Sequence, residues 1–288
     1  MNAMERTKAL MAPAGPPADE QVRSDLRGGM LHALSPEVDG LQPGHEIVVT
    51  MSLLRQTQSD PAGLAATEAP FSWKPVFVRR SLGLAVVEAC ATGRFRAPAA
   101  AIAPIASEAV AEWEHTGWRT YHWEPWLAGL APGARATVLA DALGWATSLW
   151  SAFDWSMFIT MPQLGGADDQ WVSPTSPAVR LKGRCELRLA VAAGDVSSPA
   201  SGEGRGAAPL ALVSVSAGCP GPGWREELAF LALVAALRSP ARPLPARVVG
   251  VWPDSGSHGS VEISIAALEG AMDRVAAAVR ARSEARLR

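Results

Sequence analysis

The stretch of sequence that decides the fold is LVSVSAGCPGPGWREELAFLALVAAL, from Leu212 to Leu237. Its first residues alternate small and branched side chains, a pattern that predicts a half-buried strand. Glycines and prolines interrupt the pattern between Gly218 and Gly223, and an apolar helix is predicted from there onward. Strand, turn and helix in this order often carry chemistry. Here the strand offers only Ser214 and Ser216, so we ask whether a site is present at all.

The regions on either side of this stretch predict further strands. Residues 178–195, AVRLKGRCELRLAVAAGD, alternate apolar and polar side chains and are expected to pair with residues 209–216 as a hairpin, joined by the loop of residues 194–209. Residues 246–253 and 259–265 predict two more strands. The chain is then expected to end in an amphipathic helix over residues 265–282.

The first half of the chain is predicted to be mainly helical. Core helices are predicted over residues 79–93 and 134–153, with a further helix near residues 104–113, while a strand from residue 44 runs into a helix start at SLLRQTQ. Residues 1–22 are expected to be a flexible tail. We therefore predict one mixed α/β (α+β) domain over residues 23–288, with a central sheet flanked by helices and a helical first half.

Composition excludes several classes of protein. The 288 residues are 48% hydrophobic with a net charge of -2, which allows a sizeable core and argues against a strongly basic surface overall. The three cysteines, Cys90, Cys185 and Cys219, lack the spacing of a zinc site or a disulfide framework, which favours a reducing cytoplasm. No apolar run approaches the ~18 residues of a membrane span, so no membrane association is expected.

Two candidate sites rest on weak patterns. Ser214 and Ser216, followed by Asp254 and His258, have the order of a hydrolase triad, but prolines delay the helix that a nucleophile elbow needs directly after its serine. Acids and histidines of the tryptophan-rich segment, residues 112–124, match no usual metal-ligand spacing. Asp168 and Asp169, considered with this segment, could bind a cation, but acids beside glycines in turns are common without one.

A third candidate combines the predicted hairpin with the opening strand. Several nucleases hold Mg²⁺ with a carboxylate on a hairpin strand and a second carboxylate beside a lysine on the neighbouring strand. In this chain the first carboxylate would be Glu186. The second acid and the lysine would fall at Ser214 and Ser216.

At these residues the sequence resembles the RecB-type branch of the PD-(D/E)XK nuclease superfamily. The resemblance runs from about residue 47 to the end of the chain, and it rests on the order and spacing of the motifs. The family shows a strand before a Ser-x-Leu helix start, an Arg-Gly-Thr-x-x-His-x-x-Leu-Glu helix, a Gly-Arg-x-Asp hairpin and an Asp-x-Lys-x-Gly strand. The corresponding stretches here are VVTMSLL, RRSLGLAVVE, KGRCE and SVSAG, followed by EELAFLAL and ARVVGVWPDSG.

The departures from the family pattern concern its chemistry. In the family the histidine, the aspartate and the acid-lysine pair bind metal and activate water, but here those positions hold Leu84, Glu186, Ser214 and Ser216. One carboxylate does not make the usual metal site, and the lysine that stabilises charge on a phosphate is missing from its family position, which leaves Lys182 as the only lysine in the second half of the chain. The resemblance therefore implies a catalytically inactive nuclease-like protein that needs no cofactor and binds a nucleic acid or a protein partner.

Two alternatives remain open. The first is an active DNA nuclease that uses Glu186 as a metal ligand for Mg²⁺, together with a migrated acid such as Glu88, Glu226 or Glu227. The second is a protein-interaction scaffold without nucleic-acid contact, in which some of the eleven tryptophans are exposed anchors. For DNA binding the candidate phosphate contacts are Arg79, Arg80, Arg184 and Arg188.

Overall fold

The computed structural model describes residues 2–11, 20–38, 46–59, 72–119, 121–160, 169–173, 179–191, 210–238 and 247–287. Its helices are α1 (Ala3–Met11), α2 (Glu20–Val38), α3 (Met51–Ser59), α4 (Pro75–Ala91), α5 (Pro98–Thr116), α6 (Glu124–Ala128), α7 (Pro132–Ala152), α8 (Trp224–Arg238) and α9 (Ile265–Leu287), with a short 3₁₀ turn over Trp155–Met157. Its strands are β1 (Ile47–Thr50), β2 (Phe158–Thr160), β3 (Asp169–Val172), β4 (Val179–Gly183), β5 (Leu187–Val191), β6 (Leu210–Val215), β7 (Arg247–Trp252) and β8 (Ser257–Glu262).

The strands form two sheets. The large sheet has the order β2-β5-β6-β7-β8, in which β6 and β7 are parallel and the other neighbours are antiparallel. The small sheet has the order β1-β4-β3, with β1 parallel and β3 antiparallel to β4. The predicted hairpin is present as β5 and β6, in which Leu187 pairs with Val213. The mixed α/β class is confirmed.

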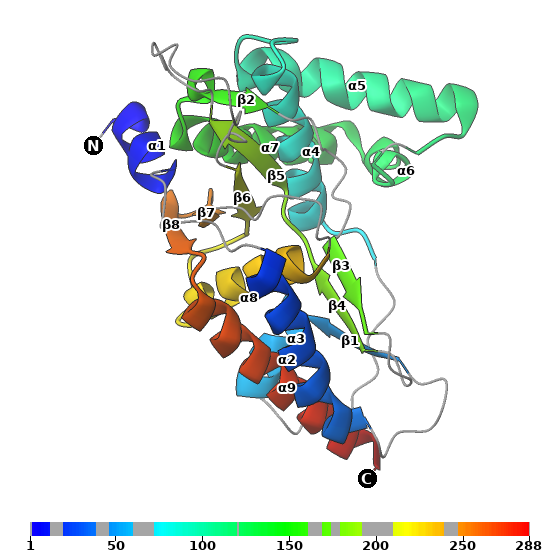
Figure 1. Ribbon diagram of the computed structural model, residues 1–288. Coiled ribbons are helices and arrows are strands. Elements are labelled where there is room, and N and C mark those ends of the chain that lie inside the picture. Colours follow the sequence, from blue (N-terminus) through cyan, green and yellow to red (C-terminus); the bar gives the residue numbers. More distant parts are fainter. Residues whose placement is uncertain are drawn as a thin grey trace.

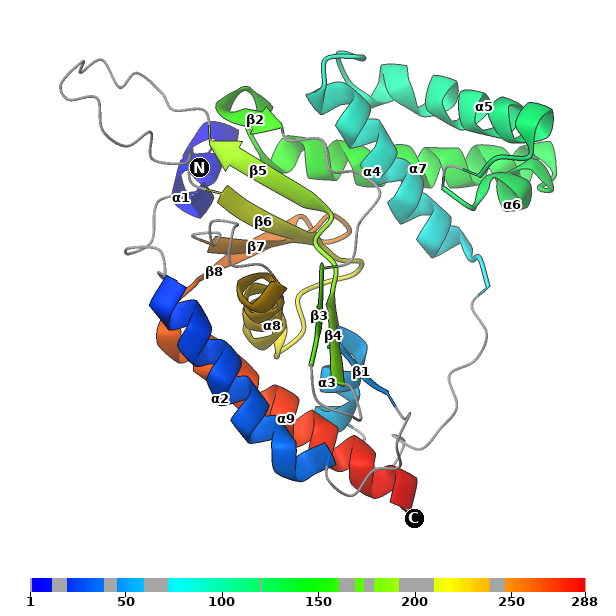
Figure 2. The same cartoon turned by 45° about the vertical axis from the view of Figure 1, so that its right-hand side comes forward.

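Helices cover both faces of the large sheet (Figures 1 and 2). Because side chains alternate along a strand, Val213 and Val215 of β6 join one hydrophobic core with α4, α5 and α7, whereas Leu212 points into a second core with α8 and α9. The small sheet packs against α8 and α9 through the second core. The result is three layers, with the small sheet extending one side.

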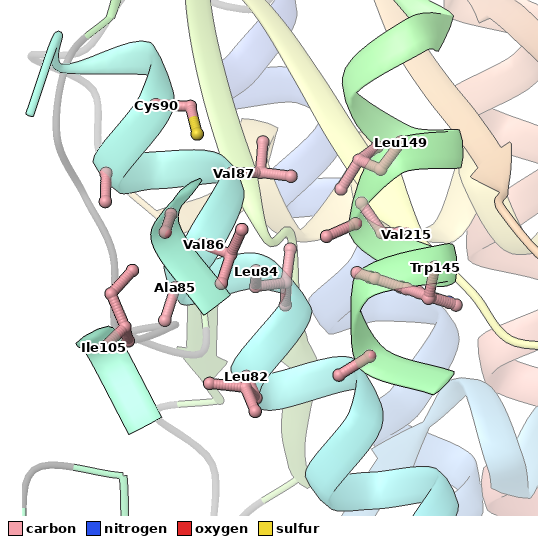
Figure 3. Packing of buried hydrophobic residues seen from close by; sticks show 14 of the residues in the cluster. Leu82, Leu84, Ala85, Val86, Val87, Cys90, Ile105, Trp145, Leu149 and Val215 are labelled. Carbon is pink, nitrogen blue, oxygen red and sulfur yellow. The ribbon is translucent and has the colours of Figure 1, made fainter. Parts of the chain in front are cut away.

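Helices α4 and α7 make the closest packing of the first core (Figure 3). Leu84 of α4 is only 6% exposed and lies in this core with Trp145 and Leu149 of α7. Gly83 permits the approach, because a Cβ atom at this position would lie 2.4 Å from Cε3 of Trp145. The candidate family position Leu84 is therefore a packing residue of the core.

The N-terminal region differs from the expectation of a flexible tail. Residues 3–11 form α1, in which Thr7 is buried. The backbone N–H of Asp154 donates to the Thr7 hydroxyl at 2.8 Å, and Arg247 donates to the Ala9 carbonyl at 3.0 Å. These contacts to distant residues hold the helix, and local composition could not predict them.

The stretch of residues 178–195 also differs from the prediction. It was expected to be one strand, but it forms β4 in the small sheet and β5 in the large sheet. The chain changes sheets between Gly183 and Leu187, so Glu186 lies where the two sheets meet. The loop of residues 194–209 lies outside the described residues, and so does Asp168.

Two further features concern the surface. Trp118 is 68% exposed, whereas each of the other ten tryptophans is buried or half-buried, so most serve the core. Within the described parts of the chain, no helix has the length and apolar composition needed to cross a bilayer.

Candidate nucleic-acid interface

A cleft of about 1050 Å³ opens where the two sheets meet. Its walls come from β1 and α3, from α4, from β4 and the segment that follows it, and from the loop between β6 and α8. The polar and charged side chains that line it are Thr50, Ser52, Arg55, Ser59, Arg80, Lys182, Arg184, Glu186, Ser214, Ser216, Cys219 and Glu227. Three of the four family positions, Glu186, Ser214 and Ser216, therefore meet in one place, while Leu84 does not.

Glu186 is the most enclosed charge of the cleft, with a side chain only 1% exposed. Its carboxylate accepts a hydrogen bond from the backbone N–H of Val215 at 2.7 Å. Arg80 of α4 donates a second hydrogen bond to it and forms an ion pair with it. Arg184 Nε lies 3.7 Å from the same Oε1 oxygen. A buried carboxylate is tolerated when charge and hydrogen bonds compensate it, and Arg80 with Val215 provide both.

The β6–α8 loop lines the cleft and is held in place by Asp254. The Asp254 carboxylate accepts hydrogen bonds from the Gly218 backbone N–H at 2.7 Å and from Arg79 at 3.0 Å. Gly218 has a φ of 76°, a left-handed conformation that favours glycine and permits the turn after β6. Asp254 and Arg79 are therefore structural, which removes Asp254 from the hydrolase triad considered above.

The other members of that triad are also separated. Ser214 and Ser216 line the cleft, whereas His258 lines a smaller cavity elsewhere in the fold. Nucleophilic catalysis needs the base within hydrogen-bond reach of the serine. The structure therefore gives no support to the serine hydrolase hypothesis.

The charges in the cleft favour anions. Among the described residues that line the cleft, four side chains are cationic, those of Arg55, Arg80, Lys182 and Arg184, and two are carboxylates, those of Glu186 and Glu227. Glu227 pairs with Arg55 across the cleft, from α8 to α3, and this hydrogen bond raises the pKa of the Arg55 guanidinium. The chain as a whole has a net charge of -2, so this cationic surplus is a local feature.

The four predicted phosphate contacts divide into two groups. Arg80 and Arg184 line the cleft, whereas Arg79 is engaged with Asp254 and Arg188 lies outside the cleft lining. Sequence reasoning missed Arg55 and Lys182 as cleft residues. Lys182 precedes Arg184 by two residues on an exposed side of the chain, a spacing that could have indicated it.

The residues of the cleft do not fit the usual magnesium site. Mg²⁺ in such sites is held by oxygen ligands, which come from one or two carboxylates together with substrate phosphates and water. Here both carboxylates that line the cleft are already paired with a guanidinium, Glu186 with Arg80 and Glu227 with Arg55. Within the described ranges, no three histidine, cysteine or acidic side chains gather as metal ligands, and this includes the acids and histidines of residues 112–119 and 121–124.

Glu88, proposed as a migrated acid, does not line the cleft. It lies on α4, two turns beyond Arg80, where burial raises the pKa of its carboxyl to about 7. Nearby Tyr121 has a raised pKa because of burial and because of the charges of Glu88 and Glu124. Glu88 is thus a half-buried acid of the helical layer, away from Glu186.

The raised pKa of Glu88 predicts a pH-dependent stability. The folded protein keeps this proton at pH values where an unfolded glutamate, with its ordinary pKa of 4.5, has lost it. Neutral Glu88 therefore contributes fully to the free energy of unfolding below about pH 4.5, and this contribution is lost as the pH rises through about 7. We expect the loss to be about 1 kcal/mol, because the half-buried carboxyl remains partly solvated.

Glu88→Gln should flatten this decline, measured as thermal unfolding midpoints at several pH values between about 4.5 and 8. The exposed Glu112→Gln on α5 is the control and should leave the decline intact. An identical pH profile in wild type and Glu88→Gln would contradict the assignment.

No model of a known protein family matches this chain, and a search of curated proteins likewise finds no relative.

Proposed function

We propose that this chain is a catalytically inactive protein of the PD-(D/E)XK nuclease type, whose cleft binds the phosphate backbone of DNA. The observation that carries the proposal is the cleft itself. Its one deeply buried carboxylate, Glu186, is neutralised by Arg80, and the half-exposed Arg184 beside it brings a further positive charge to the cleft. Such a site attracts phosphates and lacks the paired carboxylates that would cleave them.

The order of elements supports the superfamily part of the proposal. The motifs named in the resemblance fall, in order, on β1 with α3, on α4, on the segment between β4 and β5, on β6, on α8 and on β7. Within the large sheet, the β5–β6 hairpin is followed by α8 and by β7 parallel to β6. Glu186, Ser214 and Ser216 converge in one cleft, as the family alignment requires.

Gel retardation with labelled single- and double-stranded DNA tests binding. Arg184→Ala is expected to weaken binding by roughly tenfold and to reduce the slope of log affinity against log salt by about 1, because one phosphate contact is lost. Arg94→Ala is the matched control. Arg94 is 53% exposed, like Arg184, but pairs with Glu108 on α5 away from the cleft, so its loss should leave binding unchanged.

The same gels, run with Mg²⁺ or Mn²⁺ added, test whether the protein cleaves DNA. Intact, retarded DNA is the expected result. Cleavage that Glu186→Gln abolishes would overturn the inactive assignment and favour the active nuclease built around Glu186. DNA that is neither cut nor retarded would contradict the binding proposal and favour the interaction-scaffold alternative.

A further inference from the structure

Exposed apolar side chains gather around the cleft. In the described parts of the chain, the large hydrophobic side chains that are exposed are those of Met4, Val48, Val76, Phe77, Trp118, Val172 and Ile265. Four of these seven belong to the small sheet and to α4, and both of these structures line the cleft. Apolar side chains that gather on one exposed surface mark a binding site more often than scattered ones do. Contacts to phosphates alone do not account for them.

Two of the four lie on α4. Val76 and Phe77, which are 38% and 41% exposed, come one turn before Arg80, so all three lie on one side of the helix. The next residue, Val78, is buried in the first core. Arg80 is the residue of α4 that reaches Glu186 in the cleft. Phe77 therefore presents part of its ring beside the cleft.

The other two lie on the outer face of the small sheet. Val48 of β1 and Val172 of β3 both pair with Arg180 of β4, so the three residues form a row across the sheet. In the next row Thr50 pairs with Lys182, and both line the cleft. Because alternate residues of a strand share a face, the outer face of the small sheet continues the cleft wall. In Figure 2, α4 lies above this sheet, so apolar side chains flank the cleft from two elements.

This surface fits a polyanion that exposes apolar rings. The cleft contributes positive charge, including that of the half-exposed Arg184. The row on the small sheet adds mainly apolar surface, because Arg180 pairs with Glu46 at 2.7 Å. A single strand of DNA offers phosphates to the cations and unpaired bases to the apolar side chains, whereas a duplex keeps the faces of its bases stacked inside. Proteins that bind single strands combine a cationic groove with aromatic side chains on which bases stack.

The size of the cleft favours a single strand as well. Pockets that enclose one drug-sized ligand measure about 300–1,000 Å³, and the cleft measures about 1050 Å³. Such a volume takes a short run of nucleotides. A duplex is too wide to enter it and would touch only the rim.

We propose that the cleft binds single-stranded DNA in preference to duplex DNA, with one unpaired base stacked on Phe77 and the adjoining phosphates on the cations of the cleft. This preference depends on the DNA binding proposed above, and Phe77 is the residue that selects the single strand. Val48, Val76 and Val172 contact neighbouring bases and sugars. Stacking on Phe77 does not distinguish one base from another, because every base has a face that can stack.

Fluorescence anisotropy with labelled oligothymidylate, and with a duplex of the same length, tests the preference. The wild-type chain should bind the single strand more tightly than the duplex, by roughly tenfold. Phe77→Leu keeps an apolar side chain but removes the ring. It should weaken binding of the single strand by roughly tenfold and change duplex binding by less than about twofold. Phe77→Trp should keep the single-strand affinity or raise it.

Two further readouts separate stacking from charge and from folding. A strand of the same length made of abasic sites keeps the phosphates and lacks the bases, so it should bind wild type and Phe77→Leu equally. The slope of log affinity against log salt should be the same for wild type and Phe77→Leu, because stacking releases no counterions, whereas Arg184→Ala should reduce it. Ile265→Ala is the control, since it removes an exposed apolar side chain of α9 outside the cleft lining and should change none of these values.

The outcomes distinguish this preference from DNA binding itself. If both forms of DNA bind equally, or if Phe77→Leu binds oligothymidylate like wild type, the preference is wrong, while a loss in Arg184→Ala still supports DNA binding by the cleft. If Phe77→Leu weakens the abasic strand as much as oligothymidylate, Phe77 acts on the shape of the cleft and the stacking role is wrong. A wild-type chain that binds neither form would overturn DNA binding and this preference together.

Discussion

Replacing Arg80 with methionine is expected to lower the free energy of unfolding by about 3 kcal/mol. The substitution keeps the aliphatic stem but removes the only guanidinium that hydrogen bonds to the Glu186 carboxylate within the described residues. Glu186 is 1% exposed, so water does not replace the lost partner easily. The remaining hydrogen bond from Val215 compensates only part of the buried charge. The change is measured by urea or thermal unfolding.

Glu186→Gln is expected to cost less, about 1 kcal/mol. The amide oxygen still accepts from the Val215 N–H, and Arg80, which is 34% exposed, reaches solvent. The double variant Arg80→Met with Glu186→Gln should also lie about 1 kcal/mol below wild type, well under the sum of the single changes, because no buried charge is left unpaired.

The control for this cycle is an exposed ion pair. Arg94 and Glu108 are 53% and 56% exposed, so Arg94→Met should change stability by less than about 0.5 kcal/mol. If Arg80→Met is as mild as Arg94→Met, or if the two cleft substitutions add without coupling, the role assigned to Arg80 is wrong.

Replacing Gly83 with alanine is expected to destabilise the protein by about 2 kcal/mol, although alanine is the better helix former. The new Cβ would lie 2.4 Å from Cε3 and 2.9 Å from Cζ3 of Trp145. Trp145 is 3% exposed, and its neighbours in the core leave it little room to move. Helices α4 and α7 must therefore separate or the indole must leave its position.

Gly144 provides the opposite case on α7. It is exposed, and a Cβ there meets no atom within 4 Å. Gly144→Ala should therefore stabilise the protein by about 0.5–1 kcal/mol, as expected for alanine in a helix interior. Urea unfolding of both variants checks the pair. Equal effects of the two substitutions would contradict the close helix contact at Gly83.

Local patterns in the sequence predicted the elements that carry the site. The apolar periodicity of α4, α7 and α8 and the alternation in β5 and β6 are properties of neighbouring residues, and these elements are present. The motif order also predicted that Glu186, Ser214 and Ser216 lie together, and all three line the cleft. Such patterns predict an element because its apolar residues repeat at the spacing at which the helix or strand turns its side chains toward the core.

Contacts between distant residues were beyond such reasoning. Arg80 and Glu186 are 106 positions apart, and nothing local to either residue indicates that α4 presents Arg80 to the cleft and turns Leu84 into the core. Arg80 and Leu84 lie one turn apart on the same side of α4, so a shift of this helix by one turn along its axis would place Leu84 where Arg80 now meets Glu186.

Local sequence patterns were enough to predict the class of fold, the main helices and the pairing of β5 with β6, because each follows from the periodicity of side chains within a short window. Packing between distant segments, in contrast, divides one alternating stretch between two sheets, docks residues 3–11 as a helix and lets Arg80 neutralise Glu186. These three features depend on where distant surfaces meet, and their free energy comes from desolvation and ion pairing that exist only after the layers have packed.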